Sequence, residues 1–222
     1  MKIILSISLW VLILPLAFGQ SPVKHEIGVD IGTGISGVLY PDRAQYTPDF
    51  AKVVEWSRGA SASATLKYNA LLLNERLNLG AGFGYQRKSY VEGRLWDTPS
   101  VPTNYSRLPI VSQMLILPLE VGYRLPLGGR HSLMADALFV PSYQLISAPA
   151  RDFGEFTTGL IVPTVNRFNF EMGLKLGYRL QLSEKMSLQM SVMGTWEPLE
   201  REVWAYQELY NVQLVVGVRR QF

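Results

Sequence analysis

The sequence contains no cysteine, which excludes a disulfide framework and a thiolate metal site. It has only two histidines, His25 and His131, and no cluster with the spacing of metal ligands. The glycine pairs in "GTG" and "GAGFG" lie within predicted strands, so no phosphate loop is expected. The 21 basic and 18 acidic residues nearly balance and are scattered, which disfavours a nucleic-acid partner. We therefore expect no cofactor and no nucleic acid.

Residues 1–19 have the pattern of a secretory signal peptide. Lys2 supplies a positive charge, residues 3–16 form an apolar run, and small residues precede Gln20. Cleavage near Gly19/Gln20 leaves one domain, residues 20–222, with a net charge of 20 − 18 = +2. No later run reaches the roughly 18 apolar residues that a membrane-spanning helix requires.

Side chains alternate between apolar and polar in "RFNFEMGLKLGYRLQL", residues 167–182. A period of two residues is typical of a β-strand with two different faces. The same pattern occurs seven more times, and the eight predicted strands are 24–40, 61–73, 76–90, 108–126, 131–146, 167–182, 185–197 and 210–222. Pro118 and Pro141 each remove a backbone donor, so we expect a bulge or broken pairing at Pro118 and place Pro141 at the outer rim.

The predicted connections alternate between short and long. Tight polar turns occupy 73–77, 126–131 and 182–186, and longer polar links occupy 41–60, 91–107, 147–166 and 198–209. Short periplasmic turns and long external loops are typical of outer-membrane barrels. Ten strand glycines fall on the polar face and only two on the apolar face, and small side chains suit the crowded interior of a small barrel. The sequence therefore predicts an all-β, eight-stranded, antiparallel up-and-down transmembrane β-barrel. A soluble lipocalin-like carrier, with the apolar face inside, is the main alternative.

Charged residues on the predicted inner face are equal in number, six acids and six bases. Buried charges persist when they are paired, so we expect a lumen that is plugged by ion pairs. A narrow pore lined by the same side chains is the alternative. The acids are Glu26, Asp30, Glu120, Asp136, Glu171 and Glu197, and the bases are Lys67, Lys88, Arg124, Lys175, Arg179 and Arg219.

Two segments carry a family resemblance. "LILPLEVGYRL" (115–125) resembles a motif of the outer-membrane β-barrel domain family of Bacteroidetes-type bacteria, which includes PorT-like secretion proteins and OmpX-like small barrels. The terminal "VQLVVGVRRQF" is similar to the last strand of Gram-negative outer-membrane proteins, which ends in an aromatic residue that the barrel-assembly machinery recognises. The resemblance implies an outer-membrane location and gives Phe222 the role of assembly signal.

Function is predicted to be structural or interactive, through the external loops and rim, and not enzymatic. His131 and Ser132 fall on opposite faces of their strand, and both histidines lie at the periplasmic end, away from lipid A in the external leaflet. The expected partners are outer-membrane lipid, the assembly machinery and a possible protein at the external loops. A PorT-like secretion-accessory role and a porin-like narrow pore are alternatives, and a lipid-A-modifying enzyme is less favoured. The long links carry aromatic residues that either recognise a partner or pack on one another and cap the barrel. These aromatics are Tyr46, Phe50, Trp56, Trp96, Tyr105, Phe153, Phe156, Trp204 and Tyr206.

Overall fold

A computed structural model describes residues 23–38, 45–46, 51–98, 101–149, 168–197 and 209–222. Within these ranges the chain is all-β, and no helix there is long and apolar enough to cross a membrane. The predicted signal peptide and its cleavage site lie outside the described residues. The strands are β1 (Lys24–Val38), β2 (Gln45–Tyr46), β3 (Ala51–Leu72), β4 (Leu77–Thr98), β5 (Val101–Ile116), β6 (Leu119–Gly128), β7 (His131–Pro149), β8 (Phe168–Gln181), β9 (Met186–Trp196) and β10 (Leu209–Gln221).

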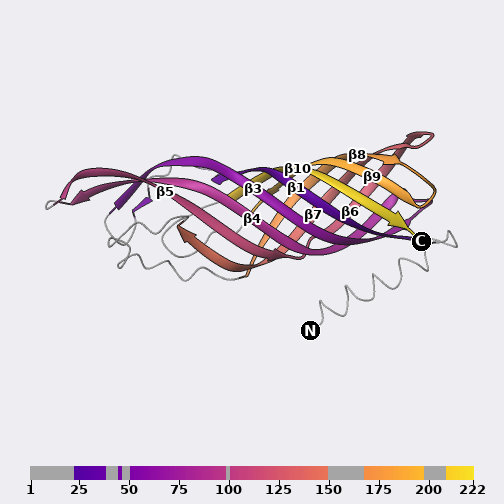
Figure 1. The fold of residues 1–222 in the computed structure, drawn as a ribbon, viewed down its shortest axis with the longest axis horizontal. Coiled ribbons are helices and arrows are strands. Elements are labelled where there is room, and N and C mark those ends of the chain that lie inside the picture. Colours follow the sequence, from indigo (N-terminus) through magenta and orange to yellow (C-terminus); the bar gives the residue numbers. More distant parts are fainter. Residues whose placement is uncertain (1–22, 39–44, 47–50, 99–100, 150–167, 198–208) are drawn as a thin grey trace.

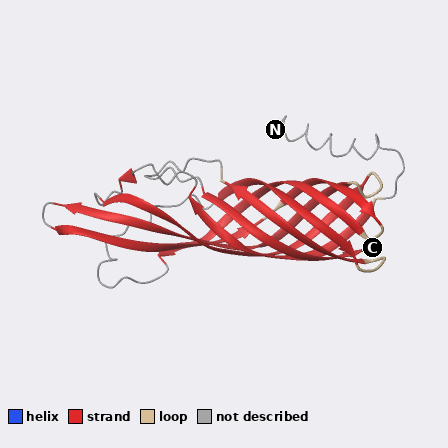
Figure 2. Ribbon diagram, turned by 90° about the horizontal axis from the view of Figure 1, so that it is seen from above, coloured by secondary structure: helices blue, strands red, loops and turns tan. Residues whose placement is uncertain are grey.

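The strands form one closed antiparallel sheet (Figures 1 and 2). Each strand pairs with the next around the ring, and β1 closes it by pairing with β10 from Glu26↔Gln221 to Val38↔Leu209. Because β5 and β6 are two halves of one barrel strand, the described sheet is an eight-stranded up-and-down barrel, as predicted. The three tight turns and Phe222 lie at one end, which we call the turn end; the opposite end is the link end.

The interruption between β5 and β6 lies at Leu117 and Pro118, which confirms the expected break in pairing. It is not a bulge, because no residue is inserted relative to β7. The pair Ile116↔Ser142 before the break and the pair Leu119↔Phe139 after it have the same register. Leu117 lies opposite Pro141 and donates its N–H to the Pro141 carbonyl at 2.9 Å. Pro118 and Pro141 have no backbone N–H to donate. Two prolines on adjacent strands therefore remove interstrand hydrogen bonds at the same height of the barrel.

Two of the predicted long links are wrong. Residues 51–60 belong to β3, and residues 91–98 and 101–107 form the ends of β4 and β5. These three strands project beyond the others at the link end (Figure 1). The β3–β4 ladder contains register shifts at Val53/Glu55 and Arg58/Ser61. Each shift places one extra residue in β3 and so reverses the phase of the alternation in that strand, which is why its period-two pattern fails over residues 51–60.

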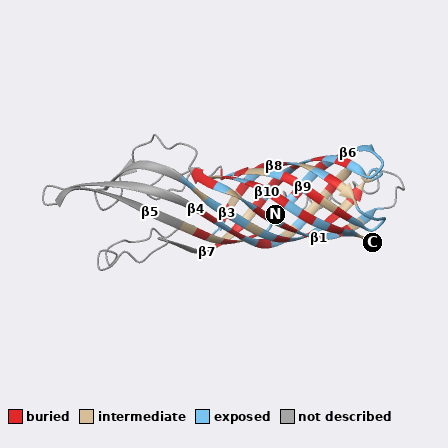
Figure 3. Cartoon of the chain, turned by 45° about the horizontal axis from the view of Figure 1, so that its top comes forward, coloured by how far each residue is buried: buried red, intermediate tan, exposed pale blue. Residues whose placement is uncertain are grey.

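Buried and exposed residues alternate along the barrel strands (Figure 3), and the buried ones are mostly polar whereas the exposed ones are mostly apolar, the reverse of a soluble protein. On β8 the apolar Leu174 and Leu176 are 60% and 63% exposed, whereas Lys175 between them is 1% exposed. The same alternation follows every barrel strand. The polar face is therefore the inside, and the outside is a surface suited to lipid.

Interior glycines make room for charged neighbours. A Cβ at Gly122 would overlap the Asp136 carboxylate, and one at Gly217 would overlap the Asp30 carboxylate. Gly194, on the outer face, has no atom within 4 Å of its Cβ position. Glycine on the inner face is therefore a packing requirement of the lumen.

Candidate functional site: a lumen of paired charges

The structure places all twelve predicted lumen charges inside the barrel. None of them is more than 7% exposed. The alternation of the strands positions these side chains, because successive residues of a strand point to opposite faces and most of the twelve charges alternate with outward-facing apolar residues. Six acids and six bases balance to zero net charge within this set.

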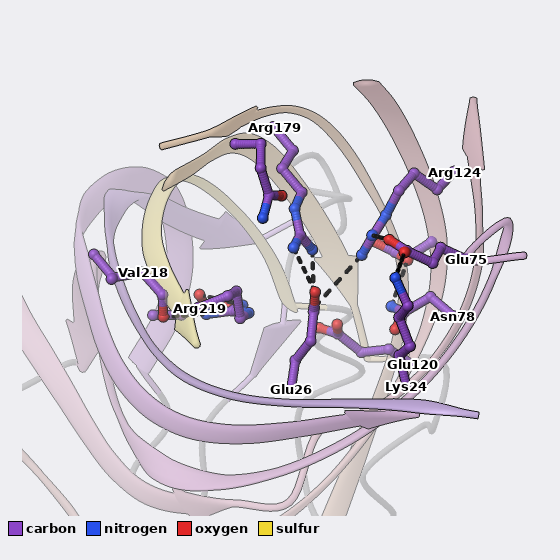
Figure 4. Close-up of polar contacts among 12 residues, drawn as sticks. Lys24, Glu26, Glu75, Asn78, Glu120, Arg124, Arg179, Val218 and Arg219 are labelled. Atoms are coloured by element: carbon purple, nitrogen blue, oxygen red, sulfur yellow. Dashed lines mark hydrogen bonds and ion pairs between the residues drawn. The ribbon is translucent and has the colours of Figure 1, made fainter. Parts of the chain in front are cut away.

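The first cluster lies near the turn end and is centred on Glu26 of β1 (Figure 4). Arg179 of β8 binds both Glu26 oxygens, with its Nη1 at 2.8 Å from Oε2. Arg124 of β6 lies 3.5 Å from the same Oε2 and 3.5 Å from Glu75, which also binds Lys24. Both arginines reach Glu26 from strands that do not neighbour β1, so this cluster crosses the lumen.

The second cluster lies at the middle of the barrel and is centred on Glu120 of β6. Its Oε2 lies 2.6 Å from Nζ of Lys175 on β8, and its Oε1 binds Nζ of Lys67 on β3. Lys67 also lies 3.0 Å from Asp30, and Lys175 lies 3.4 Å from Asp136. Five charges on five strands therefore form one continuous network.

Three further contacts extend this arrangement. Arg219 of β10 binds Asp30 at 2.5 Å. Toward the link end, Lys88 of β4 binds Glu171 of β8 at 2.6 Å, and the Thr195 hydroxyl donates to Glu171 at 2.6 Å. Apart from the two pairs of Glu75, which lies in the turn between β3 and β4, these ion pairs join different strands. Charges four residues apart on one strand are separated by about 13 Å, which is too far for direct pairing.

Little space remains between these clusters. A cavity beside Lys67, Glu120 and Lys175 has a volume of about 20 Å³, close to the space that one water molecule requires. One wall of the lumen is apolar and is formed by the buried cluster of Met114, Ile116, Leu138 and Val140. The lumen is thus filled by side chains at its middle.

Chemically, the lumen holds opposite charges in contact. Within the described residues, no group of three or more His, Asp or Glu side chains could hold a metal ion. The two histidines lie outside the lumen at the turn end. His25 Nδ1 lies 2.6 Å from the Tyr68 hydroxyl, and His131 Nδ1 contacts the Tyr178 hydroxyl.

Phe222 lies beside the first strand. Its ring stacks on the His25 ring with a centroid distance of 6.2 Å, and its N–H donates to the His25 carbonyl at 3.1 Å. The terminal residue therefore joins β10 to β1 at the point where the barrel closes.

Several contributors to the lumen were not predicted from the sequence, among them Thr195, Glu75 and Asn78. Glu75 lies in the turn between β3 and β4, outside any alternating stretch, yet it reaches Arg124. Glu75 and the two residues before it have positive φ values of 52° to 67°, which turns the chain tightly. Asn78 donates to Asp136 at 3.1 Å; its inward position at the start of the alternating β4 could have identified it.

The candidate recognition aromatics are only partly described. Tyr46, Trp56, Trp96 and Tyr105 lie on β2, β3, β4 and β5, whereas Phe50, Phe153, Phe156, Trp204 and Tyr206 lie outside the described residues. Four of the predicted external aromatics therefore belong to strands rather than to loops.

Comparison with known proteins shows the fold. Neisserial surface protein A from Neisseria superposes with a TM-score of 0.54 at 8% sequence identity, over 91% of this chain and 100% of that chain. OprG from Pseudomonas aeruginosa gives a TM-score of 0.45 at 12% identity, over 88% and 95%. Ail from Yersinia pestis gives 0.40 at 11% identity, over 90% and 99%. No family model and no curated protein sequence matches the chain. The fold is that of small outer-membrane β-barrels.

Proposed function

We propose that the protein is an integral outer-membrane barrel with a charge-plugged lumen, and that it acts as an interaction protein through its external end. The polar interior and apolar exterior support membrane insertion, because only a lipid environment favours that distribution. The turn end then faces the periplasm and the link end faces outward, as in other barrels of this architecture. Signal-peptide cleavage near Gly19/Gln20 and delivery by the barrel-assembly machinery belong to this proposal.

We assign the interaction role to the projecting sheet, which consists of residues 51–60 of β3, 91–98 of β4 and 101–109 of β5. Residues 101–109 of β5 pair with β4 on one side, whereas pairing with β7 begins only at Ile110↔Pro149. Among the described residues, this edge of β5 has no neighbour over about 30 Å, at roughly 3.3 Å per residue. An unpaired strand edge on a rigid support offers backbone donors and acceptors to an extended partner segment.

Two features of the barrel argue against a pore and against an enzyme. The cross-axis ion pairs leave little room for an ion pathway at the middle of the lumen. His131 is exposed and contacts Tyr178, whereas Ser132 is 8% exposed and faces the lumen. These two side chains do not approach as nucleophile and base, which supports a non-enzymatic role. The resemblance to PorT-like proteins makes secretion assistance the runner-up.

The test is photo-crosslinking in native membranes with a crosslinking amino acid at Thr103. One variant replaces residues 93–107 by Asn-Gly, which joins the register partners Glu92 and Leu108. A control variant shortens the link within 151–165 by the same number of residues. We expect a discrete crosslinked partner for the wild type and the control. The variant that lacks residues 93–107 carries the crosslinking amino acid at a second position, on the barrel. If this variant still crosslinks to the same partner, docking at the projecting sheet is refuted.

A further inference from the structure

The outer face of the barrel carries a groove of about 650 Å³. It runs across strands β6 to β10 between two rows of apolar side chains, one containing Leu133 and Tyr178 and the other containing Leu176 and Val192. Ala135 belongs to the second row, where it is the register partner of Leu176, and its small side chain leaves that row open. Gly177 lies between the two rows on β8. Five strands at about 4.8 Å spacing give a length of about 19 Å, and the volume is in the range of ligand sites.

The groove lies close to the turn end. Leu133 is the third residue of β7, after His131 at its start, and it pairs with Tyr178 of β8. Tyr178 reaches the rim, where its hydroxyl contacts His131. In the proposed orientation, the groove therefore faces the acyl chains of the periplasmic leaflet.

Exposed cations stand at the rim next to this groove. Arg130 lies in the turn that joins β6 to β7, and Lys185 lies in the turn that joins β8 to β9. Arg220 is exposed on β10. Glu184 is the exposed acid of these turns, so the three cations outnumber it. All the strands that line the groove thus end beside a basic rim.

We propose that the groove binds one anionic phospholipid of the periplasmic leaflet. An acyl chain lies between the two apolar rows, and Arg130 and Lys185 bind the phosphate of the headgroup. Basic residues at a membrane surface favour anionic lipid. A second copy of the chain is a poorer occupant, because a symmetric pair presents the same surface twice and would bring the two sets of rim cations together.

The experiment is native mass spectrometry of the purified full-length barrel titrated with phosphatidylglycerol or phosphatidylcholine. Ala135→Phe fills the groove, and Ala64→Phe is the matched control on the outer face of β3, also exposed. We expect one phosphatidylglycerol to remain bound to the wild type and to Ala64→Phe, and to be lost from Ala135→Phe. Heat-modified gel mobility checks that each variant is folded.

A second set of variants in the same experiment tests the contact between the rim cations and the lipid headgroup. Arg130→Gln and Lys185→Gln should each weaken phosphatidylglycerol binding about fivefold and leave phosphatidylcholine binding unchanged. Arg87→Gln, an exposed arginine of β4 near the link end, should change neither. Retention by Ala135→Phe equal to the wild type, or equal affinity for both lipids, would overturn the proposal. A dimer that Ala135→Phe dissociates would also overturn it and assign the groove to a second copy.

Discussion

Replacing Glu120 by glutamine should strongly destabilise the barrel. Glu120 is 3% exposed and binds both Lys67 and Lys175. Glutamine keeps the shape but removes the charge, so both lysines lose a partner in a dry interior. Breaking a buried pair from one side costs about 3–5 kcal/mol. Asp30 at 3.0 Å from Lys67 and Asp136 at 3.4 Å from Lys175 remain, which places the expected loss near the lower value.

A double-mutant cycle separates pairing from general damage. Lys67→Met should also destabilise the barrel, whereas the double variant Glu120→Gln/Lys67→Met should lose less than the sum of the two. In it Lys175 keeps Asp136, and Asp30 keeps Arg219. We expect a coupling energy within the range of 0.5–3 kcal/mol known for contacting residues.

Reversible urea unfolding in detergent or lipid vesicles, followed by tryptophan fluorescence and heat-modified gel mobility, measures these free energies. Glu184→Gln is the control, because Glu184 is an exposed turn residue and such changes stay within about 0.5 kcal/mol. A loss below about 1 kcal/mol for Glu120→Gln with no coupling to Lys67 would refute the reasoning. It would mean that water solvates these charges and that the pairs do not hold the lumen closed.

Three other changes give sharp expectations. Gly122→Ala should destabilise the barrel by about 1–3 kcal/mol, because the new Cβ overlaps the Asp136 carboxylate, whereas Gly194→Ala has open space and should be neutral in the same unfolding assay. Gly128→Ala should cost about 1–3 kcal/mol although nothing lies within 4 Å, because Gly128 has a φ of 102°; a loss no larger than that of Gly194→Ala would contradict this. Deleting Phe222 should lower the heat-modifiable fraction in isolated outer membranes, and an unchanged fraction would remove its role as an assembly signal.

The inner face of the barrel strands could be predicted from the sequence because it depends on a period of two residues, and their order could be predicted because tight turns join neighbouring antiparallel strands. That period placed Lys175 inside and Leu174 outside, and the structure agrees. It could not predict the partner of Lys175, because Glu120 lies two strands away, and such contacts depend on the stagger of all eight strands. The pairing of Lys88 with Glu171 also depends on this stagger, so the sequence could not predict it.

The projecting sheet could not be predicted for a different reason. Bulges near Val53 and Arg58 shift the alternation, and Pro102 and Pro109 argue against a strand. Glu75 was missed because it reaches the lumen from a turn. Prediction from the hydrophobic pattern therefore succeeds along the regular barrel strands and fails where the backbone is irregular, at bulges, prolines and turns.

Planar-bilayer recording of the wild-type barrel beside Glu171→Ala tests the central claim most directly. Glu171 holds Lys88 across the lumen at 2.6 Å. A lumen closed by ion pairs predicts negligible steady conductance for the wild type and a lower unfolding temperature for the variant. A stable, ion-selective wild-type conductance, with unchanged stability of Glu171→Ala, would show instead that the same charges line an open channel.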